Sequence, residues 1–194
     1  MLALVVLTAC RDSSAGEART TVPTRPPTSS TTATTAVSYD VPAVIDAVYV
    51  EKVMAALDHV EGEAVRRAAA QGRLDETFVR TLASIYGPEA AELTQQVWSA
   101  VAGNGFKMLA RYPKDPRTKV LRMIVSERSC ILAEIERDFS QVFTKPDPPS
   151  PRRFLALTPL PVDRNPGGQN PTPWTISFDG HFTDESEPGR GDAC

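Results

Sequence analysis

Three cysteines are the residues whose positions point most directly to chemistry in this chain of 194 residues. Cys10 directly follows nine uncharged, mostly apolar residues, whereas Cys130 and Cys194 lie far from it. If Cys10 serves another purpose, the other two form an even pair, which predicts a disulfide in an oxidising compartment. That bridge would enclose about 65 residues and stabilise the fold by on the order of 4 kcal/mol in the chain-entropy model. Two free thiols, or a catalytic Cys130, are the alternatives.

Histidines and helical carboxylates add no sign of catalysis. A catalytic thiol needs a nearby base, and no sequence signature ties His59 or His181 to Cys130. The segment around His59 also carries Asp58, Glu61 and Glu63. A zinc site needs three or four ligands, and no second histidine is near, so these residues predict a charged helix surface. The chain has no glycine-rich phosphate loop and no Gly-x-Ser-x-Gly motif. We therefore predict no catalytic residue, no metal and no cofactor.

A strand-like segment, residues 130–139, supplies the next candidates because its residues alternate in character. Its two faces carry Ile131, Ala133 and Ile135 on one side and Glu134, Glu136 and Asp138 on the other. The acidic face predicts a solvated outer surface, paired with Arg122 and Arg152. Arg137 is in register with the apolar residues. It either binds an anionic ligand at the mouth of a pocket or extends its guanidinium outward to solvent, and we expect the second arrangement.

Aromatic residues complete the set of candidates. Tyr49, Tyr86 and Tyr112 could donate hydrogen bonds within a pocket, although tyrosines at the edge of a core are commoner. Trp98 and Trp174 are expected in the core rather than as platforms for a ligand. The candidate ligand-binding residues are Arg137, Tyr86, Tyr112 and Trp174.

The elements that must position these residues are helices followed by strands. Helical spacing predicts helices over about 40–72, 75–86 and 88–103, and alternation predicts strands over 118–126, 130–139, 153–160 and 174–178. Val44 and Val48 are assigned to the buried stripe of the first helix, and Leu93 and Val97 to that of the third. Helices that precede strands predict an α+β fold with three helices packed on a curved four-stranded antiparallel sheet. We assign residues 39–194 to this single domain.

The N-terminal segment is different in composition. Between Thr20 and Ser38, eleven of nineteen residues are Thr or Ser, and Pro23 is one of three prolines there. Such a stretch cannot bury enough apolar area to offset the entropy of ordering, so residues 10–38 are predicted to be a disordered stalk. The net charge of −3 gives no basic field for nucleic acid.

Residues Leu7-Thr8-Ala9-Cys10 resemble the lipobox of a bacterial lipoprotein signal peptide. The resemblance implies that residues 1–9 are the end of a signal peptide, that Cys10 carries a lipid, and that the protein is anchored on the extracytoplasmic face of the cell membrane. Several acyl chains anchor a protein stably without a spanning helix. A basic segment, typical of such signal peptides, is absent before the apolar run, so we expect the true start codon upstream of Met1.

The order of elements resembles the cystatin-like α+β cone of ketosteroid isomerase, nuclear transport factor two and polyketide cyclases. The lipobox, the pair Cys130 and Cys194, and the segment Asn170-Pro171-Thr172-Pro173-Trp174 are similar to those of actinobacterial secreted lipoproteins of unknown function. The resemblance implies a pocket between sheet and helices. It favours a non-catalytic module that binds a small apolar ligand, an envelope protein partner or a second copy of itself. Alternatives are a pocket enzyme of the isomerase or cyclase kind and a structural partner of a membrane transport complex.

Overall fold

A computed structural model describes residues 40–145 and 153–181. The predictions for the signal peptide, Cys10, the stalk, Arg152 and Cys194 lie outside these residues. The described elements, in chain order, are α1 (Ala47–Gln71), α2 (Glu76–Ile85), α3 (Pro88–Gly103), β1 (Arg117–Glu127), β2 (Cys130–Asp138), β3 (Arg153–Pro159), the 3-10 helix η1 (Val162–Arg164) and β4 (Trp174–Gly180).

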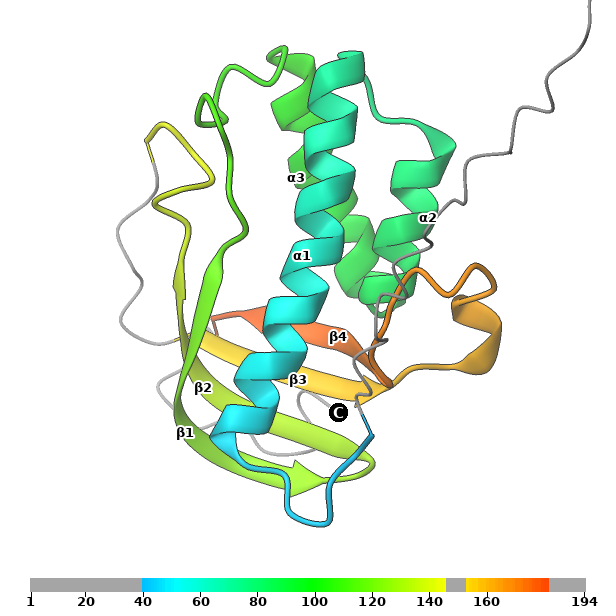
Figure 1. The fold of residues 1–194 in the computed structure, drawn as a ribbon, viewed down its shortest axis with the longest axis vertical. Coiled ribbons are helices and arrows are strands. Elements are labelled where there is room, and N and C mark those ends of the chain that lie inside the picture. Colours follow the sequence, from blue (N-terminus) through cyan, green and yellow to red (C-terminus); the bar gives the residue numbers. More distant parts are fainter. Residues whose placement is uncertain (1–39, 146–152, 182–194) are drawn as a thin grey trace, which may run out of the picture. The chain divides into compact units, whose positions relative to one another are not determined.

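The four strands form one antiparallel sheet in the order β1-β2-β3-β4, and α1 crosses its concave side with α2 and α3 beside it (Figure 1). β1 and β2 make a tight hairpin that closes at the pair Glu127 and Cys130. The predicted α+β fold, with three helices before a four-stranded antiparallel sheet, is confirmed. Within the described residues, no helix is long and apolar enough to cross a membrane.

The core lies between α1, α2 and the inner face of the sheet. Ile131, Ala133 and Ile135 of β2 point into it, as their alternation predicts. The largest fully buried side chains are Trp174, Phe78, Met54, Leu57, Leu82, Ile85, Ile131, Leu132, Ile135, Leu155, Leu157 and Ile176. Leu132 alternates onto the opposite face of β2 yet is fully buried, so that face is not solvated along its whole length, contrary to the prediction.

The first helix begins later than its predicted start near Asp40. Asp46 caps it, because the Oδ1 atom of Asp46 accepts a hydrogen bond from the backbone N–H of Tyr49 at 2.8 Å. Val44 precedes the helix, and Val48 lies on its outer side. Both side chains are more than two thirds exposed, at 76% and 72%. Their assignment to the buried stripe was therefore wrong. The helix ends as predicted, at Gly72, which adopts the left-handed conformation with φ 69°.

Each edge of the sheet is partly covered by another segment. At the outer edge of β4, Tyr86 forms a parallel bridge with Ile176, and the N–H of Gly87 donates to the carbonyl of Ile176 at 2.8 Å. At the outer edge of β1, the N–H of Val120 donates to a carboxylate oxygen of Glu51 on α1 at 2.9 Å. The chain between α2 and α3 is thus fastened to the sheet.

Cys130 opens β2 and is completely buried. Its predicted partner, Cys194, lies outside the described residues, so the disulfide between them stays a prediction. Glu134 on the same strand forms the predicted ion pair with Arg122, at 3.1 Å.

Candidate ligand-binding pocket

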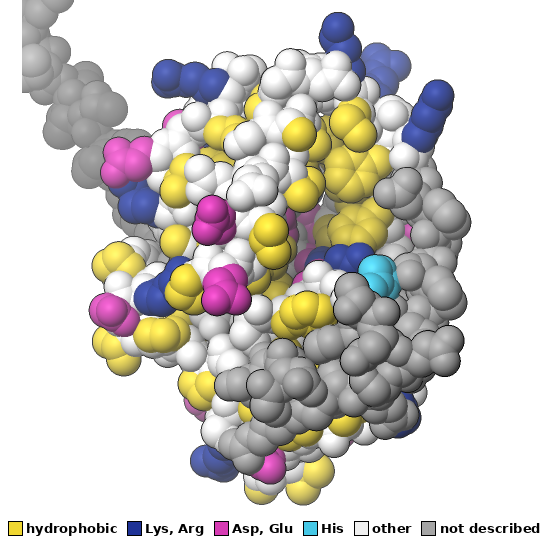
Figure 2. All heavy atoms as spheres, turned by 180° about the vertical axis from the view of Figure 1, so that it is seen from behind, with side chains coloured by type: hydrophobic (Ala, Val, Ile, Leu, Met, Phe, Trp, Pro, Cys, Tyr) yellow, Lys and Arg dark blue, Asp and Glu magenta, His cyan; other side chains and the backbone are white. Residues whose placement is uncertain are grey.

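A pocket of about 750 Å³ opens between α1, α3 and one end of the sheet. Figure 2 shows it as a hollow with apolar side chains on its walls and charged groups at its floor. Its volume is within the range of small-molecule sites. The apolar lining consists of Val65, Ala90, Leu93, Val97, Trp98, Phe139, Val142, Phe143 and Phe178.

The third helix supplies much of one wall. Leu93 and Val97 are 63% and 57% exposed, although their spacing assigned them to the core, and that assignment was wrong. Only Trp98 and Val101 of α3 are buried. The apolar stripe is real, but Leu93 and Val97 on it face the pocket instead of another element.

The floor of the pocket contains two acidic residues from α1. Asp58 and Glu61 lie on the same helical stripe as Met54 and Val65, at spacings of four, seven and eleven residues from Met54. Met54 and Val65 are buried and Asp58 is 1% exposed, so the stripe faces inward. The predicted charged outer surface was therefore wrong for these two residues, whereas Glu63 does lie on the surface and pairs with Arg66 at 2.7 Å.

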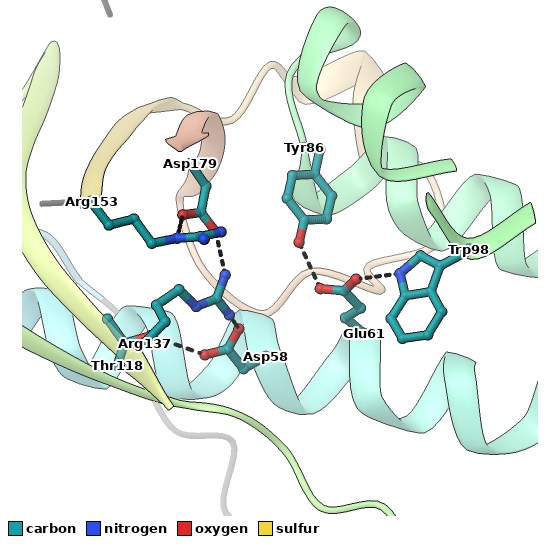
Figure 3. Close-up of polar contacts among 8 residues, drawn as sticks. All are labelled: Asp58, Glu61, Tyr86, Trp98, Thr118, Arg137, Arg153 and Asp179. Carbon is teal, nitrogen blue, oxygen red and sulfur yellow. Dashed lines mark hydrogen bonds and ion pairs between the residues drawn. The ribbon is translucent and has the colours of Figure 1, made fainter. Parts of the chain in front are cut away.

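One end of the sheet supplies the charges that balance Asp58. Because neighbouring strands are antiparallel, the end of β2, the start of β3 and the end of β4 meet there. They carry Arg137, Arg153 and Asp179 respectively. Arg137 donates to Asp58 and to Asp179, and the Nε atom of Arg153 donates to Asp179 at 2.6 Å (Figure 3). We call Asp58, Arg137, Asp179 and Arg153 the floor quartet.

The prediction that Arg137 extends outward was wrong. Its side chain is inward and only 7% of the residue is exposed. A guanidinium is tolerated at this depth because two carboxylates partner it and offset the cost of desolvation. Its Nε atom, also buried, makes no hydrogen bond with the described residues.

Burial shifts the acid–base properties of the quartet. Desolvation raises the pKa of Asp58 from 3.8 to about 7, and the opposing attraction of Arg137 only partly compensates. Asp58 also accepts a hydrogen bond from the Thr118 hydroxyl at 3.3 Å. Desolvation likewise favours the neutral form of Asp179, but Arg137 and Arg153 outweigh it and hold the pKa of Asp179 below its usual value. Asp58 therefore changes its charge near neutral pH while Asp179 stays ionised.

Glu61 is held differently, by two neutral donors. Its Oε2 atom accepts from the Tyr86 hydroxyl at 2.6 Å, and its Oε1 atom accepts from the Trp98 indole at 2.7 Å (Figure 3). Burial, and secondly the charge of Glu61, raise the pKa of Tyr86 well above its usual value, so the phenol remains a donor. Within the described residues, Glu61 has no ion-pair partner at 4 Å or less.

The structure brings some of the sequence-predicted candidates together and separates others. Arg137 and Tyr86 both line the pocket. Tyr112 is 76% exposed and lies outside it. Trp174 is buried in the core, where its indole donates to the Tyr49 hydroxyl at 2.8 Å. Trp98, expected only in the core, is also a wall of the pocket.

The histidines take no part in a metal centre within the described segments, in which no group of three or more His, Cys, Asp or Glu side chains could hold a metal ion. The Nδ1 atom of His59 lies 2.9 Å from a carboxylate oxygen of Asp115. His181 is exposed and borders the pocket.

Asp58 and Glu61 are the residues that sequence reasoning missed. A signal for them was present, since both fall on an apolar stripe of α1 rather than on its polar side. Their partners, however, come from separate segments of the chain, and no local pattern indicates those contacts.

Compared with protein-family models, curated proteins and solved structures, the chain matches none of them. The resemblance to the cystatin-like cone and to secreted lipoproteins accordingly stays a prediction, and the function must be inferred from the pocket.

Proposed function

We propose that the protein is a lipid-anchored module of the cell envelope that binds a small, mainly apolar molecule without transforming it. The observation that carries this proposal is the pocket of about 750 Å³, with apolar walls and an ordered polar floor. A module that acts only as a scaffold needs no such space. The pocket therefore favours ligand binding over a purely structural role in a membrane transport complex.

The exposed stripe on α3 supports the same proposal. Leu93 and Val97 lie more than half exposed on the pocket wall. Burying one such side chain completely is worth about 1.5 to 3 kcal/mol. An apolar ligand that covers the stripe recovers part of that free energy, and the buried, unpaired Nε atom of Arg137 offers a donor to an acceptor group on it.

Val97→Asp is expected to weaken binding of an apolar ligand at least about ten-fold, because a bound apolar molecule would desolvate the new carboxylate. The probe is N-phenyl-1-naphthylamine, a neutral dye that fluoresces in apolar surroundings, titrated into the protein. Val162→Asp is the matched control, since Val162 is 95% exposed and does not line the pocket. Equal dye binding by both variants and the unaltered protein, at unchanged thermal stability, contradicts the proposed site.

Cys10→Ala is expected to release the protein from membranes, because lipidation requires the Cys10 thiol and no other anchor is proposed. The full chain is expressed in a bacterial host behind a complete lipoprotein leader, and its membrane and soluble fractions are compared by immunoblotting. The unaltered protein should sediment with membranes and partition into detergent. A variant that stays membrane-bound after a high-salt wash disproves the anchor.

An acid–base enzyme is the second candidate, favoured by one observation. Asp58, at the floor of the pocket, has a pKa of about 7, the range in which a side chain can both take and give a proton. However, Asp58 is 1% exposed and both of its oxygens are occupied, by Arg137 and Thr118. This arrangement fits a structural carboxylate better than a general base. Turnover of an isomerisation substrate that is lost in Asp58→Asn would reverse that preference.

A further inference from the structure

The polar floor indicates which chemical class of ligand the pocket takes, an inference that rests on the proposed binding function. The floor quartet contains two guanidinium groups and two carboxylates, and its members pair with one another. When both carboxylates are ionised, the quartet is neutral and its charges are already satisfied. In that state, which requires a pH above the Asp58 pKa of about 7, the quartet offers no net charge to a ligand.

Glu61 is the carboxylate at the floor that makes no ion pair at 4 Å or less with the described residues, although Arg137 lies close enough to attract it. Its two hydrogen bonds come from Tyr86 and Trp98, both neutral donors. Each carboxylate oxygen can accept two hydrogen bonds, so each has capacity for one more. Glu61 is partly exposed, borders the pocket, and can be reached from it.

We propose that the ligand is a cationic amphiphile whose protonated amine binds Glu61 while its apolar body lies along Leu93 and Val97 of α3. A bond between an ammonium group and a carboxylate is roughly twice as strong as a bond between neutral groups. The amine supplies a positively charged partner for Glu61 and donates a further hydrogen bond to each of its carboxylate oxygens.

The surroundings of Glu61 hold its carboxylate in place for this role. Trp98 is fixed by two aromatic neighbours, with Phe78 edge-on at 6.4 Å and Phe143 stacked at 6.2 Å between ring centroids. Tyr86 is fastened to the sheet through its bridge to Ile176. Tyr86 and Trp98 are thus positioning residues, which orient the carboxylate before a ligand arrives and so reduce the entropy cost of binding.

An anionic ligand fits the floor less well. Arg137 is engaged by Asp58 and Asp179, so an anion would compete with those carboxylates there, and Arg153 already donates to Asp179 through its Nε atom. It would also approach the negative charge of Glu61. A neutral alcohol avoids that repulsion, but it donates a single hydrogen bond to the carboxylate and lacks the attraction between opposite charges.

The test compares three ligands with one chain length and different heads: decylammonium, decan-1-ol and decanoate. Each displaces N-phenyl-1-naphthylamine from the full chain at pH 8.5, above the Asp58 pKa of about 7, so that both carboxylates of the quartet are ionised. We expect decylammonium to bind about ten-fold more tightly than decan-1-ol, and decanoate to bind most weakly. Added salt should weaken decylammonium binding but not decan-1-ol binding.

Glu61→Gln keeps the shape of the side chain and removes its charge. We expect the preference for decylammonium over decan-1-ol to fall to within about two-fold, while decan-1-ol affinity is retained. Glu89→Gln is the matched control, because Glu89 also borders the pocket but is not held by Tyr86 and Trp98. It should keep the preference. If Glu61→Gln does not fold, the head-group order and salt response of the unaltered protein still test the proposal.

The failures of the two proposals differ. If decan-1-ol binds and decylammonium is not preferred, the proposal of a cationic ligand is disproved, whereas the proposed binding function of the pocket is retained. Equal loss of preference in Glu61→Gln and Glu89→Gln also overturns the assignment to Glu61. If none of the three ligands, nor the dye, binds the unaltered protein, the proposed binding function fails instead.

Discussion

Arg137→Met is expected to lower the free energy of unfolding by about 1 to 3 kcal/mol, because the buried carboxyl groups of Asp58 and Asp179 each lose a hydrogen-bond donor. Arg137 bridges Asp58 and Asp179, and without it Asp58 faces Asp179 across a desolvated site. Met fills a similar volume without charge, so the loss reports electrostatics more than packing. Denaturant unfolding of both proteins at pH 7, followed by circular dichroism, measures the difference.

A surface ion pair provides the control for this prediction. Arg80 pairs with Glu76 at 2.6 Å, but both side chains are more than half exposed, so Arg80→Met should change stability by less than about 1 kcal/mol. Adding Asp58→Asn to Arg137→Met should restore part of the stability, since Asp179 still has Arg153 as its partner. The prediction fails if Arg137→Met is no more destabilising than Arg80→Met.

Asp58→Asn should become more stable relative to the unaltered protein as pH rises from 4 to 7, by as much as about 1.4 kcal/mol for each pH unit. The pKa of Asp58 is raised in the folded protein from 3.8 to about 7. The folded state therefore binds this proton more tightly than the unfolded state. The stability that this bound proton contributes is fully present below the unfolded-state pKa of 3.8. It is lost as pH rises through the folded-state pKa of about 7. Asn cannot ionise and avoids that loss.

Other groups must be separated from this effect. Asp179, whose pKa is lowered, contributes stability that is lost as pH falls. It is present in both proteins, so the difference between them isolates Asp58. Asp163→Asn, at an exposed position of η1, is the control and should track the unaltered protein at every pH. A constant gap between Asp58→Asn and the unaltered protein from pH 4 to pH 7 would show that folding does not raise the pKa of Asp58.

The fold was predictable from the sequence because its signals are local. The alternation of residues 130–139 indicates a strand and also which face is inward, and Gly72 marks the end of α1. The start of α1 was placed too early because Val44 and Val48 continue a helical spacing although neither is buried. Periodicity indicates an apolar stripe, but it does not say what the stripe faces.

A pocket between sheet and helices was expected, but the residues of its floor were not predictable, because their contacts join distant segments. Asp58 and Arg137 are 79 positions apart, and Arg137 and Asp179 are 42 apart. An isolated carboxylate on a helix and an isolated arginine on a strand each resemble surface residues. The antiparallel order of the strands brings Arg137, Arg153 and Asp179 close to Asp58 on α1. The ion pairs among these residues then offset the free-energy cost of burying their charges.

The covered edges of the sheet limit how two copies of the protein could associate. An open strand edge presents unpaired N–H and carbonyl groups that invite a strand from another chain, which leads to domain swapping or aggregation. Here, Tyr86 and Gly87 occupy the edge of β4, and Glu51 engages an amide at the edge of β1. At these positions a strand from another chain cannot pair, which disfavours a homodimer that extends the sheet there. Blocking these positions reduces the risk that one copy templates strand pairing by the next at high local concentration.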